Sequence, residues 1–288
     1  MRRTTVFSAT TLVAGLLALT ACSATGEGPA TESPAPASPA PKSSEFAVPA
    51  FLEERGTVIY CATLDNPPRA SVDESGNQVG FEVELGEEIA RLGGLEVVWL
   101  QLTFDGLISA VQADQCDVIM QELFIKAERL EIMDMIPFSN SGHQIVVLAD
   151  GEFADAQTLA DLSGAKAAVP NGTTQHILTQ EASDALEAEG KAPIGVVVLQ
   201  TTTDSFQQLS SGVVDAVVTT TTAAAYYKGI RDDFTVAGPA FDLIQAGIAV
   251  KKGNDELTAF IQEAFDHIYE SGLYDELIVK WNMQGSAL

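Results

Sequence analysis

One arginine, Arg129, is placed where it could bind an anion. Residues 117–120 form a short apolar run, and the polar side chains of Gln121 and Glu122 follow that run directly. Open α/β sheets build ligand pockets at the ends of their strands, where such side chains gather. A guanidinium offers a planar fork of donors that fits a carboxylate, and it stays charged at any working pH. We predict that Arg129 holds a carboxylate; the alternative is a surface arginine that pairs with a neighbouring glutamate.

The run Gly172, Thr173, Thr174 and Gln175 is a second candidate anion site. It lies between a predicted strand and a predicted helix. A loop that enters a helix presents unpaired N–H groups and the positive end of the helix dipole. Gly172 has no side chain that would block the approach of a ligand. The alternative for this run is an ordinary turn followed by a helix cap.

Two sets of alternating strands and helices would position these residues. The first set has apolar runs and helical spacings in this order: 57–63, 81–92, 96–100, 103–111 and 117–120. The second set follows in the same manner: 175–189, 194–199, 205–209 and 215–219. Such alternation predicts parallel sheets covered by helices. Extended stretches at 143–148 and 241–250 would join the two sets, and the breaker cluster 139–142 precedes the first of them.

We therefore predict an α/β protein of two lobes with two hinge crossovers between them. Each lobe would be a mostly parallel sheet flanked by helices, with the cleft between the lobes as the binding site. The predicted first lobe comprises residues 46–142 plus 246–288, and the predicted second lobe comprises 143–245.

The N-terminus reads as an export signal with a lipid attachment site. Arg2 and Arg3 precede an apolar run that is too short to span a bilayer, so residues 1–21 are predicted to be a signal peptide. The small residues before Cys22 resemble the lipobox of bacterial lipoproteins, in which the cysteine carries the lipid. Residues 22–45 are rich in Ala, Pro and Ser, a composition typical of a disordered tether. The predicted location is the outer face of the cell membrane; the alternative is an ordinary secretory peptide.

Composition excludes several classes of partner. The formal net charge is −25, which argues against nucleic acid and anionic lipid. His143, His176 and His267 do not have metal-ligand spacing, and no phosphate-binding, dinucleotide-binding or nucleophile-elbow motif is present. We expect no metal, no cofactor and no catalytic residue.

Cys61 and Cys116 remain if Cys22 carries lipid. An exported protein with two cysteines suggests a disulfide. However, Cys61 lies late in one predicted strand and Cys116 begins another. If these strands are parallel neighbours, the cysteines lie on the order of 10 Å apart at ~3.3 Å per residue. The expectation is therefore that no disulfide forms.

Segments along most of residues 55–282 resemble the solute-binding proteins of bacterial amino-acid ABC transporters (family 3, type II periplasmic-binding-protein-like fold). The segments that carry the resemblance are 67–68 (PP), 80–85 (GFEVEL), Phe104, 117–119 (DVI), 125–129 (IKAER), 172–175 (GTTQ), 211–216 (SGVVDA) and 280–281 (KW). The resemblance implies a monomeric, non-enzymatic protein that closes on a small solute. It would deliver that solute to a permease and ATPase complex.

The resemblance also implies roles for single residues. Arg129 matches the arginine that pairs with the ligand carboxylate, and residues 172–175 match the carboxylate cradle on the second lobe. Phe104 matches a position that lines the pocket, although a core role is the alternative. Asn66 stands where relatives often carry a stacking aromatic. Arg69 replaces an aromatic, and it would either contact an anionic group of the ligand or lie in solvent.

Other positions also depart from the family pattern. Thr220 stands where relatives carry the acid that holds the ligand ammonium. Glu122 and Phe124 replace small residues, and Gln121 precedes them. Glu122 would take over the ammonium; the alternative is that the solute has no free ammonium. The sequence therefore predicts an amino acid or a related carboxylate-bearing solute without saying which one.

Two other functions fit the same fold. One is an enzyme such as a cyclohexadienyl dehydratase, for which Glu122 or Asp65 would be the general acid. The other is a sensory module that passes ligand state to a membrane receptor.

Overall fold

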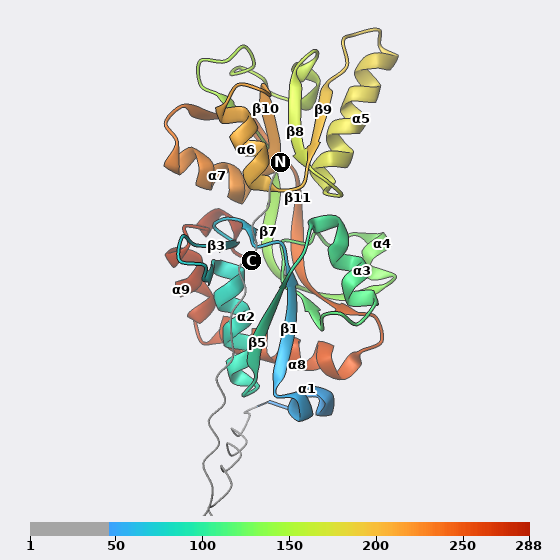
Figure 1. Cartoon of the computed structure of the whole chain (residues 1–288), viewed down its shortest axis with the longest axis vertical. Helices are drawn as coiled ribbons and strands as arrows, with labels where there is room; N and C mark the ends of the chain where they lie inside the picture. The colour runs from blue at the N-terminus through green and yellow to red at the C-terminus, as the bar shows by residue number, and fades with distance from the viewer. Residues whose placement is uncertain (1–45) are drawn as a thin grey trace, which may run out of the picture. The chain divides into compact units, whose positions relative to one another are not determined.

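The computed structural model describes residues 46–288, so the predicted signal peptide, Cys22 and the whole predicted tether lie outside the described residues. The described residues belong to one compact unit, shown in Figure 1. Its elements before the first crossover are α1 Ala50–Arg55, β1 Thr57–Ala62, β2 Asp65–Asn66, β3 Ala70–Val72, β4 Gln78–Val79, α2 Phe81–Leu92, β5 Glu96–Gln101, the 3₁₀ turn Phe104–Gly106, α3 Leu107–Gln112, β6 Val118–Ile119 and α4 Ala127–Leu130.

The elements that follow are β7 Met133–Leu148, the 3₁₀ turn Leu159–Leu162, β8 Lys166–Pro170, α5 Thr174–Ala188, β9 Gly195–Leu199, α6 Thr202–Ser210, β10 Ala216–Thr220, α7 Thr221–Ile230, β11 Phe234–Lys251, α8 Asp255–Glu270, α9 Leu273–Lys280 and the 3₁₀ turn Gln284–Ser286. The α/β alternation expected from the apolar periodicity is confirmed. Helix α6 begins earlier than predicted, because Thr201 caps it by accepting a hydrogen bond from the N–H of Asp204.

Eight of the strands form one sheet of order β5-β1-β6-β11-β7-β10-β8-β9, and β2, β3 and β4 form a separate small sheet. β1 is parallel to β5 and β6, and β8 is parallel to β9 and β10. We call the β5-β1-β6 side the first lobe and the β10-β8-β9 side the second lobe. The two-lobed α/β architecture is confirmed, whereas the lobe bounds at 142 and 246 stay a prediction.

Strands β7 and β11 are the two crossovers, and they run from one lobe into the other (Figure 1). They pair with each other in antiparallel register along most of their length. The expected break at residues 139–142 is wrong, since β7 continues through it. Ser139, Asn140 and Ser141 pair with Ala246, Gln245 and Ile244, so ladder bonds override the local turn preference.

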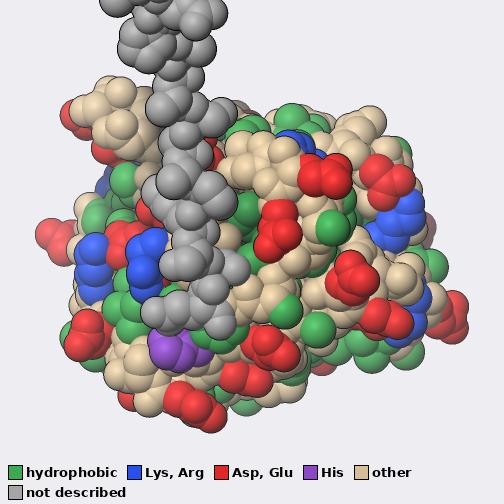
Figure 2. Space-filling model, turned by 90° about the horizontal axis from the view of Figure 1, so that it is seen from below, with side chains coloured by type: hydrophobic (Ala, Val, Ile, Leu, Met, Phe, Trp, Pro, Cys, Tyr) green, Lys and Arg blue, Asp and Glu red, His purple; other side chains and the backbone are tan. Residues whose placement is uncertain are grey.

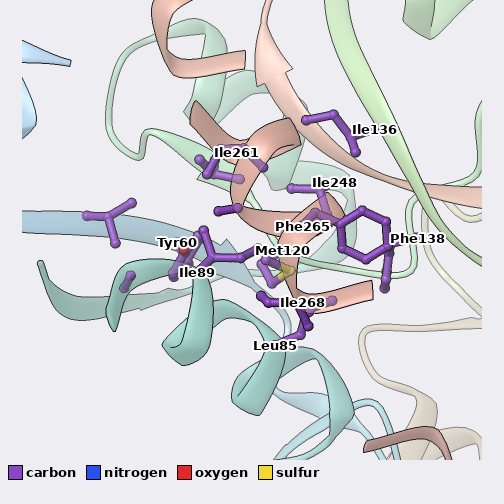
Figure 3. Packing of buried hydrophobic residues seen from close by; sticks show 14 of the residues in the cluster. Tyr60, Leu85, Ile89, Met120, Ile136, Phe138, Ile248, Ile261, Phe265 and Ile268 are labelled. Carbon is purple, nitrogen blue, oxygen red and sulfur yellow. The ribbon is translucent and has the colours of Figure 1, made fainter. Parts of the chain in front are cut away.

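The largest apolar core lies in the first lobe, where α2, α8 and α9 cover the sheet. Figure 3 shows side chains from β1, α2, β7, β11 and α8 meeting there. The labelled residues are Tyr60, Leu85, Ile89, Met120, Ile136, Phe138, Ile248, Ile261, Phe265 and Ile268. Both crossovers contribute to this core, so it anchors the hinge strands to a rigid base.

Cys61 and Cys116 form a disulfide, so the expectation of free thiols is wrong. Their Cα atoms are 5.8 Å apart. Cys116 lies in the turn between α3 and β6, not in the strand, and Asp114 in this turn has a positive φ of 56°. The estimate of ~3.3 Å per residue applies only to extended chain. The turn brings Cys116 over β1, which the strand geometry alone did not allow.

The surface is acidic, as the composition predicted. Figure 2 shows aspartate and glutamate side chains spread over one face of the protein. Among residues 46–288, no helix combines the length and the apolar character needed to cross a bilayer. In the same range, no group of three or more His, Cys, Asp or Glu side chains could hold a metal ion.

Candidate functional site

A cleft opens between the lobes at the C-terminal ends of the parallel strands. Its walls combine two acids, three apolar residues and many uncharged polar side chains. The first lobe supplies Thr63, Asp65, Asn66, Phe104, Gln121, Glu122 and Phe124. The second lobe supplies Pro170, Thr173, Thr174, Gln175, Gln200, Thr202, Thr219 and Thr220. Strand ends of open α/β sheets are where ligands bind, because side chains of successive loops converge there.

The N-terminus of α5 forms one wall of the cleft. Thr173 caps the helix by accepting a hydrogen bond from the N–H of His176 at 3.2 Å. Thr174 is the next residue, and it is only 3 % exposed. Its Oγ1 atom has no hydrogen-bond partner among the described residues. A buried hydroxyl without a hydrogen-bond partner destabilises the protein, so a ligand that accepts a hydrogen bond from it would remove that penalty.

Helices α6 and α7 of the second lobe also begin at the cleft. Thr201 caps α6, and Thr220 caps α7 through the N–H of Ala223. Thr220 thus lines the cleft and fixes a helix start at the same time. The positive ends of three helix dipoles are therefore directed toward the cleft.

An acid of the first lobe meets each of these three helix starts. Asp105 accepts a hydrogen bond of 2.8 Å from the Asn171 amide just before α5. Asp65 accepts one of 3.2 Å from the backbone N–H of Thr202, the first residue of α6. Burial raises the pKa of Asp65 above its ordinary value, and the hydrogen bonds to that carboxylate only partly oppose this increase. These pairs bring the lobes together on both sides of the cleft.

Gly172 is required by this close approach. Its φ is +72°, and a Cβ at this position would lie 2.8 Å from the Cβ of Asp105. A glycine therefore serves both the left-handed backbone and the contact between the lobes.

The third pair joins Glu122 to α7. Thr222 Oγ1 donates to Glu122 Oε1 at 3.3 Å. The same carboxylate accepts hydrogen bonds from Asn66 at 3.1 Å and from Ser141 at 2.6 Å, and it lies 2.9 Å from Arg69 Nε. Both Glu122 oxygens therefore have protein partners. This geometry argues against Glu122 as the acid that receives a ligand ammonium.

Arg69 is completely buried, which excludes the alternative that it lies in solvent. It pairs with Glu122 and with Glu82 and does not line the cleft. Burial raises the pKa of Glu82 to about 7; Arg69 opposes this increase, and Glu122 adds to it. No sequence pattern indicates this network, because Arg69, Glu122 and Thr222 are far apart in the chain.

Arg129 does not line the cleft either. Its Nη1 atom donates a hydrogen bond of 2.8 Å to the carbonyl of Phe124, a residue that does line the cleft. Burial lowers the pKa of Arg129, and Glu128 raises it. Phe124 packs its ring against His143, with 5.2 Å between centroids. Arg129 thus supports the cleft wall from behind in this structure.

The structure places most of the predicted site residues in the cleft. Those that line it are Asn66, Phe104, Gln121, Glu122, Phe124, Thr173, Thr174, Gln175 and Thr220, whereas Arg69, Arg129 and Gly172 do not. Lining residues that the sequence reasoning did not assign to ligand binding are Thr63, Asp65, Pro170, Gln200, Thr202 and Thr219. Several of these residues end a strand or begin a helix. Their position at strand ends could therefore have been used to predict that they line the cleft.

Comparison with known proteins places the chain in a family. Residues 58–284 match the family model described as bacterial extracellular solute-binding proteins, family 3. The chain belongs to this family. The family resemblance predicted from the sequence is confirmed, and solved relatives have the same two-lobed fold.

Three similar proteins illustrate this. The L-cystine-binding protein TcyJ of Escherichia coli (strain K12) is 27 % identical over 232 residues, which cover 80 % of this chain and 84 % of TcyJ. A mutant of ArgBP from T. maritima has 35 % identity and a TM-score of 0.73, covering 81 % of this chain and 98 % of ArgBP. An ancestral arginine-binding protein bound to glutamine has 32 % identity and a TM-score of 0.72, covering 80 % and 99 % of the two chains. These proteins are named for binding, in agreement with the prediction that the chain is not an enzyme.

Proposed function

We propose that this protein captures an amino acid, or a close carboxylate-bearing derivative, between its two lobes. The observation that carries this proposal is the buried Thr174 hydroxyl at the start of α5, which has no hydrogen-bond partner among residues 46–288 and belongs to a residue that lines the cleft. A carboxylate placed there would accept hydrogen bonds from that hydroxyl and from free N–H groups of the first helical turn. The amino-acid ligands in the names of the relatives support the same class of solute.

Arg129 is our proposed second contact to the carboxylate. Its guanidinium donates one hydrogen bond to the Phe124 carbonyl, and its other N–H groups could contact a ligand. A change of side-chain rotamer toward the cleft would bring the remaining donors to the ligand. Arg129 from the first lobe and Thr174 from the second would then bridge the lobes, so that ligand stabilises the closed form.

Replacing Thr174 with valine is expected to weaken amino-acid binding by roughly 10- to 100-fold, because a hydrogen bond to a charged group is worth about 1.5–3 kcal/mol. The ligand-free variant should be at least as stable as the wild type, since an unpaired buried hydroxyl is removed. Isothermal titration with the solute that co-purifies with the protein measures the first effect, and thermal unfolding measures the second.

A matched control is Thr179→Val on the same helix. Thr179 is equally buried, but its hydroxyl donates to the Gln175 carbonyl at 2.7 Å. This variant should lose stability and keep its affinity. Unchanged affinity in Thr174→Val would overturn the carboxylate site.

Closure of the lobes should depend on Asp105, which contacts Asn171 and does not line the cleft. Replacing Asp105 with alanine removes a contact of the closed form, which we expect to raise the dissociation rate about 2- to 10-fold with little change in the association rate. Stopped-flow fluorescence measures both rates. Glu84→Ala is the control, because Glu84 pairs with Lys280 inside the first lobe. Equal rates in the Asp105 variant and the wild type would refute this role.

Delivery of the solute to an ABC transporter permease is the role we propose for the closed form. The test is uptake of the co-purified solute by the source bacterium after deletion of the gene. Loss of uptake supports transport, whereas normal uptake with a lost response to the solute supports a sensory role.

The N-terminus would tether the protein to the outer face of the membrane through lipid on Cys22. Replacing Cys22 with serine is expected to move the protein from the membrane fraction to the soluble fraction, because one acyl-bearing residue is lost. Cell fractionation with immunoblotting measures this shift. If the wild type and Cys22→Ser distribute equally between the membrane and soluble fractions, the lipid anchor is refuted.

A further inference from the structure

Arg69 is a buried cation in the wall behind the cleft. It is 0 % exposed, and its guanidinium reaches side chains from four parts of the fold. Nε contacts Glu122 at 2.9 Å and donates to Thr222 of the second lobe at 3.1 Å. Nη1 donates to Glu82 at 3.2 Å and to Ser139 on the crossover β7 at 3.0 Å. An arginine with these partners cannot leave the network to contact a ligand.

The charge of Arg69 is matched mainly to Glu122. Glu82 is the other carboxylate of the network, and burial raises the pKa of Glu82 to about 7. Near neutral pH a large fraction of Glu82 therefore carries no charge. The guanidinium then compensates the Glu122 carboxylate from inside the protein.

Glu122 nevertheless lines the cleft, where an uncompensated carboxylate would attract a ligand cation. Among residues 46–288, the only other acid in the lining is Asp65, which accepts a hydrogen bond from the backbone N–H at the start of α6. The rest of the lining is uncharged, and most of it can form hydrogen bonds. A ligand with an extra positive charge would lose its hydration on entering the cleft and would find no free carboxylate to replace it.

We propose that Arg69 is a specificity-determining residue: it is the internal counter-ion of Glu122, so the cleft selects amino acids with uncharged polar side chains against lysine and arginine. This inference rests on the proposed function. It also means that Arg69 acts through Glu122 and not by contact with the ligand.

The test is isothermal titration of the full chain with L-glutamine, L-threonine, L-asparagine, L-lysine and L-arginine. We expect the wild type to bind at least one of the three uncharged-side-chain ligands at least tenfold more tightly than lysine or arginine. Arg69→Met frees Glu122, and the affinity for lysine and arginine should rise at least tenfold relative to that uncharged ligand. The double variant Arg69→Met/Glu122→Gln should lose this gain.

Two further variants control for folding. Arg231→Met removes an exposed arginine that pairs with Asp233, and it should leave the affinity ratio unchanged. If Arg69→Met does not fold, Glu122→Gln tests the same inference through a change in the opposite direction. Arg69 is then uncompensated, so lysine and arginine should bind still more weakly relative to the uncharged ligands.

The outcomes separate the two levels of the proposal. The inference is overturned if the wild type binds lysine or arginine more tightly than the uncharged-side-chain ligands. It is also overturned if Arg69→Met leaves the affinity ratio of cationic to uncharged ligands unchanged. If Arg69→Met is unfolded, an unchanged ratio in Glu122→Gln overturns it. Absence of binding by the whole panel and by a wider set of amino acids would instead contradict the proposed function.

Discussion

Replacing Arg69 with methionine is expected to lower the free energy of unfolding by about 3–5 kcal/mol at pH 8. Removing one partner of a buried ion pair leaves the other charge uncompensated, and this loss has that magnitude. Here two carboxylates, Glu82 and Glu122, lose their cation, and both are buried. Urea unfolding followed by circular dichroism measures the loss.

The loss should depend on pH in a direction that Glu82 fixes. Burial raises the pKa of Glu82 in the folded protein to about 7, above the ordinary value of 4.5. The folded state then binds more protons than the unfolded state between these values, so stability decreases as pH rises from about 4.5 to about 7. Without Arg69 the pKa of Glu82 rises further, because Arg69 lowers it. The deficit of the variant should therefore be smaller at pH 5.5 than at pH 8.

A matched pair of variants tests this explanation. Glu82→Gln should remove most of the decrease in wild-type stability between pH 5 and pH 7. Arg231→Met removes an exposed arginine, and it should change the free energy of unfolding by no more than about 0.5 kcal/mol. A pH-independent deficit in Arg69→Met would contradict the role that we assign to Glu82.

Loss of the disulfide between Cys61 and Cys116 is expected to lower the free energy of unfolding by about 2–4 kcal/mol. The bond closes a loop with a sequence separation of 55, and closing such a loop restricts the unfolded chain. Both cysteines are buried, so alanine in both positions also removes apolar contacts in the core beneath α3. The double variant Cys61→Ala/Cys116→Ala measures the effect by urea unfolding.

Reduction of the wild-type protein is the matched control. Dithiothreitol should lower the wild-type unfolding midpoint toward that of the double variant, and it should leave the double variant unchanged. Titration of thiols in the denatured wild type should show two more after reduction than before. No change in thiol number would show that the bond does not form in the isolated protein.

The amino-acid sequence by itself determined the alternation of strands and helices and many of the residues that line the cleft. Apolar periodicity is a local property, so the strands at 57–63 and 215–219 and the helix at 81–92 could be read directly. Residues such as Gln121 and Thr174 follow a strand end, and strand ends of a parallel sheet share one edge. Local order was therefore sufficient to bring these residues to one cleft.

Only the tertiary structure decided which distant groups meet. Arg69 lies 153 residues from Thr222 in sequence, and the turn at Asp114 brings Cys116 over a strand. Arg129 matched the family pattern, yet its guanidinium binds a backbone carbonyl in this structure. Partner choice for such groups depends on burial and on closure of the lobes, and neither is encoded in any short stretch of sequence. The charge of the cleft wall, and with it our inference about the solute, is set by these long-range contacts.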